Sequence, residues 1–145
     1  MEENFFLKKI RPAPGVVLLM ALYAITIMSL LFIGVLWLVT TDLQISTNYL
    51  YYEQALFLAD AGIEDALTQL RQNHLWSAGF SNVEFPAGSG NYYTVTVTNN
   101  YPVVVLNSTG TVRTNFVRQV AASVNVTGPP AASPYVVRVD YWREL

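Results

Sequence analysis

Side chains that could take part in chemistry are few in this 145-residue chain, and they are scattered. There is no cysteine, which excludes disulfides, thiolate catalysis and cysteine-ligated metals. The neighbouring carboxylates Glu64 and Asp65 diverge by about 100° around a helix, so they do not form a dyad. The sequence has no nucleophile–base pairing, no metal-ligand spacing and no glycine-rich phosphate loop. It therefore predicts neither an enzyme nor a bound cofactor or metal.

Three other polar features are interpreted as structural. His74, the single histidine, has no catalytic partner nearby in sequence and is expected to be an ordinary loop or helix-end residue. The triplets that begin at Asn107 and Asn125 match the N-glycosylation pattern, and we interpret both as strand and turn residues. The net charge of −2 gives no basic surface for nucleic acid.

The elements that must position these residues begin with an apolar segment. Residues 12–41 contain no charge, and residues 16–41 would span about 39 Å as a helix, more than the ~30 Å hydrocarbon core of a bilayer. Lys8, Lys9 and Arg11 precede the segment and Asp42 follows it, which predicts a single pass with the amino terminus inside. A cleaved secretory signal peptide is the alternative, but the apolar run is too long and lacks an A-x-A-like site.

Residues 42–73 continue as an amphipathic helix with one apolar stripe. Its members are alternately four and three residues apart: Ile45, Tyr49, Tyr52, Leu56, Ala59, Ile63, Ala66 and Leu70. We expect the carboxyl-terminal half of the stripe to cover the protein's own sheet. A small sheet cannot cover so long a helix, so the part between Ile45 and Tyr52 is expected to need a partner outside the chain.

Residues 74–145 are predicted to form a β-sheet domain. Residues 74–90 are rich in glycine and serine and are expected to be a loop. Alternation predicts strands at residues 92–98, 103–106, 116–127 and 135–141, with turns at Asn99-Asn100 and around Ser108-Thr109-Gly110. In the last strand, Tyr135, Val137, Val139 and Tyr141 should share one face. The expected fold is α+β: a long helix packed on a small antiparallel sheet of three to five strands.

Three segments of this chain resemble type IV pilin-like proteins, most closely the PilX-type minor pilins and pseudopilins. A basic leader, residues 1–15, ends in glycine directly before the apolar helix. Residues 54–64 (QALFLADAGIE) are similar to the family's A-F-x-x-A-E-A-G-hydrophobic-E segment, and residues 106–120 to its S-T-G and R-x-V strand pair. The matching positions of the central motif are Ala59, Asp60, Ala61, Gly62 and Glu64.

The resemblance implies a biosynthetic route and a set of partners. A prepilin peptidase would cut between Gly15 and Val16, leaving the apolar helix on the mature chain. The protein would then stay in the inner membrane, single-pass, until an assembly platform moves it into a periplasmic or surface filament of other pilins or pseudopilins. Most pilins carry glutamate at the fifth mature position, which is Met20 here; this departure favours a minor or tip subunit over a bulk one.

A second function stays open at this stage. The chain could be a single-pass membrane anchor that presents a small β-domain for binding or adhesion, without entering a filament. Processing of the amino terminus and co-purification with pilus fibres would separate the two hypotheses.

Overall fold

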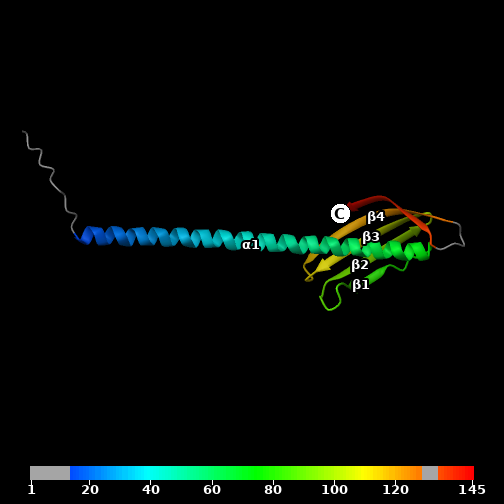
Figure 1. The fold of residues 1–145 in the computed structure, drawn as a ribbon, viewed down its shortest axis with the longest axis horizontal. Coiled ribbons are helices and arrows are strands. Elements are labelled where there is room, and N and C mark those ends of the chain that lie inside the picture. Colours follow the sequence, from blue (N-terminus) through cyan, green and yellow to red (C-terminus); the bar gives the residue numbers. More distant parts are fainter. Residues whose placement is uncertain (1–13, 129–133) are drawn as a thin grey trace, which may run out of the picture. The chain divides into compact units, whose positions relative to one another are not determined.

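The computed structural model describes residues 14–128 and 134–145, which form one helix and five strands (Figure 1). The helix is α1 (Pro14–Gln72). The strands are β1 (Phe80–Glu84), β2 (Tyr92–Asn100), β3 (Val103–Val112), β4 (Phe116–Thr127) and β5 (Val136–Glu144). The predicted α+β class, a long amino-terminal helix packed on an antiparallel sheet, is confirmed.

The chain divides into two compact units between Ile45 and Ser46. In the first unit, every described side chain from Gly15 onward is exposed except that of Thr41, which is half-buried. This part of α1 is long and apolar enough to span a membrane, judged by length and composition. Its hydroxyl groups are satisfied within the helix: Ser29 donates to the carbonyl of Ile25, and Thr41 to that of Trp37.

The second unit contains the remainder of α1 and the sheet. The strands follow one another in the order β1-β2-β3-β4-β5, and every neighbouring pair is antiparallel. One face of this meander packs against α1 (Figure 1). The connections are short, as expected where consecutive antiparallel strands pair.

The core lies between α1 and the central strands. Helix residues three and four apart turn one apolar face to the sheet, where alternate strand residues meet it. The helix contributes Ala59, Ile63, Ala66, Leu67 and Leu70, and the sheet contributes Tyr93, Val95, Val104, Leu106, Val120, Ala122, Val124 and Val126. Strict alternation on β2 and β4, which the sequence predicted, is therefore what builds the sheet side of the core.

Two glycines allow the helix and the sheet to approach closely. A Cβ atom at Gly110 of β3 would lie 2.0 Å from the carbonyl oxygen of Ala55 and 2.7 Å from the backbone nitrogen of Ala59. A Cβ atom at Gly62 of α1 would lie 2.5 Å from Oγ of Ser108. The backbones are thus in direct contact, and no larger residue fits at either position without a shift.

This contact explains one wrong prediction. Ser108, Thr109 and Gly110 do not form a turn: β3 continues through them to Val112, paired with β2 and β4 on both sides. Glycine and serine usually indicate a turn. Here Gly110 is required for the close approach of Ala55, and Ser108 is fully buried beneath Gly62.

Two smaller differences concern the sheet edges and turns. Residues 74–90, expected to be a loop, contain β1, a short edge strand whose register shifts between Phe80 and Val83. That irregularity removes the regular alternation on which the prediction of a strand depends. Asn99 and Asn100 belong to β2, and the turn falls two residues later, at Tyr101 and Pro102.

The last strand differs in which face its residues occupy. Val139 pairs with Val124, but Tyr141 pairs with Ser123, so Asp140 is an additional residue between them and forms a bulge. Because directly paired residues share a face, Tyr141 lies on the side away from α1, contrary to the prediction, and Trp142 lies on the helix side opposite Ala122.

Candidate functional site

The predicted processing position lies at the beginning of the described helix. Residues 1–13 of the leader are outside the described residues. Gly15 has no atom within 4 Å of the place where a Cβ would lie, and Val16 is 51% exposed. A side chain at Gly15 would therefore meet no other described part of the chain.

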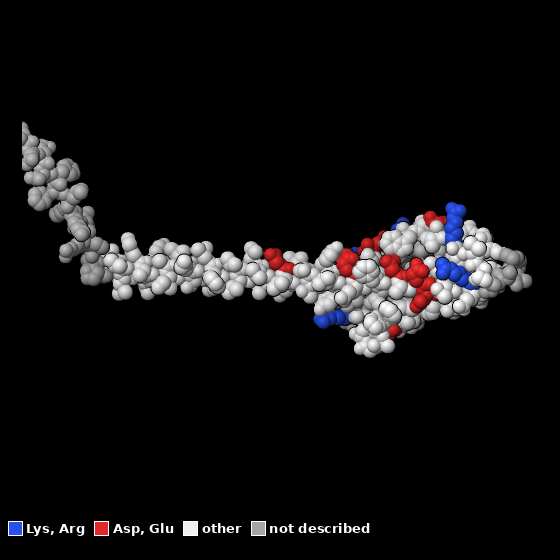
Figure 2. Space-filling view, in the orientation of Figure 1, with Lys and Arg blue, Asp and Glu red and all other residues white. Residues whose placement is uncertain are grey.

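The first unit presents an uninterrupted apolar surface. Its large side chains include Met28, Phe32 and Trp37, each more than 70% exposed. The described helix has no charged residue before Asp42, and on the face shown in Figure 2 the surface of its first part is almost entirely white. Such a surface is suited to lipid or to the apolar faces of other helices.

The predicted stripe changes from exposed to buried along α1. In the first unit Ile45 is 62% exposed, and at the start of the second unit Tyr49 is 63% exposed. Hydrogen bonding to Glu53 raises the pKa of Tyr49 above its usual value. Tyr52 is 38% exposed and Leu56 is partly buried. The other members, Ala59, Ile63, Ala66 and Leu70, lie in the core under the sheet.

An aromatic and cationic cluster lies where the second unit begins. The ring of Phe116 is 4.9 Å from that of Tyr51 and 5.2 Å from that of Tyr52, measured between centroids. The guanidinium carbon of Arg113 lies 4.5 Å from the Tyr51 ring centre, and that of Arg118 lies 5.0 Å from the Tyr52 ring centre. The sequence indicated packing tyrosines here, but their partners on β4 and the preceding turn were not identified. These contacts fix the β3–β4 turn to the helix.

The residues of the central motif serve the contact between helix and sheet. Ala59 and Gly62 are buried, and Ala61 is half-buried. Asp60 accepts a hydrogen bond from the indole nitrogen of Trp142 at 3.0 Å. Glu64 is exposed. The motif therefore connects α1 to β3 and β5.

Asp65, next to this motif, is paired as well. The phenolic hydroxyl of Tyr93 on β2 donates a hydrogen bond to its carboxylate. Burial of the tyrosine, together with the bond to Asp65 and its negative charge, raises the pKa of Tyr93 to about 12. Glu64 and Asp65 thus have different surroundings, as their divergent directions predicted.

His74 and the two glycosylation-like triplets take ordinary structural positions. The His74 ring lies 4.5 Å from that of Tyr135 and 5.0 Å from that of Tyr101, and its carbonyl accepts a hydrogen bond from Asn99. Asn107 and Asn125 both lie within strands. In residues 14–128 and 134–145, no group of three or more histidine, cysteine, aspartate or glutamate side chains could hold a metal ion.

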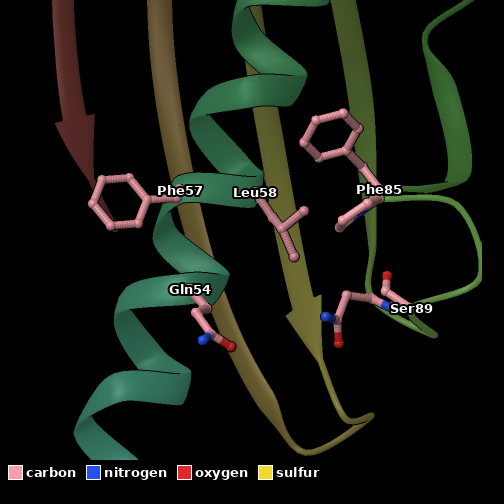
Figure 3. A pocket seen from close by; sticks show the side chains of 7 residues that line it. Gln54, Phe57, Leu58, Phe85 and Ser89 are labelled. Atoms are coloured by element: carbon pink, nitrogen blue, oxygen red, sulfur yellow. Dashed lines mark hydrogen bonds between the residues drawn. The ribbon is translucent and has the colours of Figure 1, made fainter.

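An apolar groove of about 380 Å³ lies between α1 and the β1–β2 connection. It is lined by Gln54, Phe57, Leu58, Phe85, Pro86, Ser89 and Asn91. Figure 3 shows Phe57 and Phe85 on opposite sides of Leu58. The carboxylate of Glu84 accepts a hydrogen bond from the backbone of Gly90 at 2.6 Å, which fixes the connection and lowers the pKa of Glu84. The sequence showed only a loop here.

Comparisons with protein-family models, with curated proteins and with solved structures give no match for this chain.

Proposed function

We propose that this chain is a pilin-like structural subunit, a minor pilin or pseudopilin that is anchored in a membrane and assembles into a filament through α1. One observation carries the proposal. A single helix is uncharged and exposed through residues 16–41, and packs on a small antiparallel sheet only in its later part. A protein that is only anchored in a membrane does not need its membrane helix to continue into the core of its folded domain.

The exposed apolar side chains of the first unit need an environment that removes them from water. Burying one large aliphatic or aromatic side chain is worth about 1.5–3 kcal/mol, and this unit exposes many of them. A membrane supplies that burial. A bundle of like helices does so equally well, so transfer from lipid to a filament core exchanges one apolar setting for another.

The exposed stripe supports association beyond the membrane. Ile45 and Tyr49 continue the spacing of the buried core residues and are each more than 60% exposed, while Tyr52 is covered in part by the ring of Phe116. A neighbouring helix that runs alongside would complete the stripe as a heptad-like interface. Met20 in place of an acidic residue favours a minor subunit over a repeated bulk one, because no buried carboxylate is available there for a neighbour's amino terminus.

The first experiment determines the mature amino terminus. Mass spectrometry of the membrane-extracted protein, produced with and without an active prepilin peptidase, should give a chain that starts at Val16 only when the peptidase is active. Gly15→Leu replaces the glycine after which the peptidase would cut, so it should block the cut. Because Gly15 lies in open space, the substitution leaves the packed core unchanged.

A matched control is Gly34→Leu, which also lies in open space and should leave processing intact. A chain that begins at Met1 in both hosts would contradict the filament proposal. The protein would then be a single-pass anchored binding domain, a function that the apolar groove around Leu58 favours, and it would not co-purify with filaments.

A further inference from the structure

The face of the sheet opposite α1 contains a second, polar groove. Its volume is about 320 Å³, and it is lined by Asn125, Thr127, Val136, Arg138 and Asp140. The register explains why these residues meet: Asn125 pairs with Arg138 and Thr127 pairs with Val136. Val124 and Val126 face the helix, so their neighbours Asn125 and Thr127 face outward.

Alternation along β5 places Arg138 and Asp140 side by side on this outer face, with the guanidinium Nε 3.5 Å from the carboxylate Oδ1. The bulge at Asp140, in the middle of the strand, adds Tyr141 to the same face, next to the groove and 46% exposed. The β4 residue paired with it, Ser123, is small and buried.

One polar atom at this groove has no partner. The side-chain oxygen of Asn125 is buried and accepts no hydrogen bond from the described residues. A buried acceptor without a donor is costly, and native proteins satisfy most such atoms with protein, water or ligand. A ligand hydroxyl group would supply the missing donor once the side chains that cover this oxygen move aside.

The charges of the groove restrict the ligand further. Arg138 and Asp140 form an ion pair without net charge. An anionic ligand would be repelled by the carboxylate, and a cationic ligand would be repelled by the guanidinium. Together the pair offers donors and acceptors side by side, the arrangement that two adjacent hydroxyl groups of a sugar ring require. Tyr141 supplies an aromatic face on which the apolar side of such a ring can stack.

We propose that this groove binds a neutral saccharide, with Arg138, Asp140 and Asn125 hydrogen-bonded to its hydroxyl groups and Tyr141 stacked on the ring. Its volume lies in the range of small-ligand sites. The proposal does not depend on filament assembly, because every residue involved lies in the second unit.

The test uses the full chain in a detergent without a sugar headgroup, so that the detergent does not compete. The probes are the methyl glycosides of glucose, galactose, mannose and N-acetylglucosamine, with inorganic phosphate as an ionic probe. Saturation-transfer NMR should show at least one glycoside bound with a millimolar Kd, and no binding of phosphate. Arg138→Ala and Asp140→Asn should each weaken binding about tenfold or more, since each removes a charged hydrogen-bonding group.

The matched control is Arg143→Ala. Arg143 lies on the same strand and the same outer face, but it pairs with Ala121, beyond Tyr141 and outside the groove. Its variant should bind the glycoside as the unchanged protein does. The proposal is overturned if no glycoside binds, if phosphate binds instead, or if Arg138→Ala and Arg143→Ala have the same affinity.

Discussion

At the scale of single residues, the contact between Gly110 and the helix backbone is the tightest constraint on the second unit. A methyl group at this position would overlap the carbonyl oxygen of Ala55, which belongs to the backbone and cannot rotate away. We expect Gly110→Ala to lower the free energy of unfolding by about 3 kcal/mol, at the upper end of overpacking costs. Chemical denaturation followed by near-UV circular dichroism measures this change.

Gly34→Ala is the control for this substitution. It introduces the same methyl group at a helical glycine with open space around it, and alanine is the better helix former. The second unit should unfold at the same denaturant concentration as in the unchanged protein. Equal effects of the two variants would contradict the role assigned to the close approach.

Tyr93 gives the second unit a dependence on alkaline pH. Its pKa is raised from 10.0 to about 12 in the folded protein by burial and by Asp65, so the folded state favours the neutral phenol. The resulting stabilisation is complete below pH 10 and is lost as the pH rises through 12. The free energy of unfolding of the unchanged protein should therefore fall relative to that of Tyr93→Phe as the pH rises from 10 to about 12.

Ultraviolet titration of the phenolate tests the same residue directly. One tyrosine should ionise about two units above the ordinary range. Asp65→Asn removes the negative charge but leaves the burial, so the late transition should move part of the way back. If all tyrosines ionise together in the unchanged protein, the assigned environment of Tyr93 is wrong.

At the scale of elements, β5 shows how one additional residue changes which side chains face the helix and which face outward. Because of the bulge at Asp140, Trp142 reaches Asp60 on α1 while Tyr141 faces outward. We expect Trp142→Phe and Asp60→Ala each to lower stability by about 1 kcal/mol, and the double variant to cost less than the sum. Denaturant titrations of the four proteins give this coupling energy.

Tyr141→Phe is the control for the Trp142 substitution. It removes one polar group from the adjacent residue on the opposite face of the strand, so it should show no coupling with Asp60→Ala. Additive effects of Trp142→Phe and Asp60→Ala would show that the indole–carboxylate bond contributes nothing measurable.

The elements that the sequence predicted well share a regular period. β2 and β4 alternate strictly, and α1 follows its stripe, so their existence and buried faces were readable from residues such as Val95, Val124 and Ile63. The failures are irregular. β1 contains a register shift, β5 a bulge, and the glycine in β3 serves a tertiary contact that no local pattern records.

At the scale of the whole molecule, the candidate sites were predictable only in part. The apolar segment and the exposed part of the stripe follow from composition and spacing alone. The two grooves do not: the first brings together residues distant in sequence, such as Leu58 and Phe85, and the second depends on the exact pairing of β4 with β5. Neither groove has a motif of its own, so strand pairing and helix placement had to be known first.

The use of one helix in both units also has a mechanical consequence. Within the second unit, the buried residues of α1 from Ala55 to Leu70 lie against the sheet. Force along this helix would load its contacts in shear, so many must yield together before the unit extends.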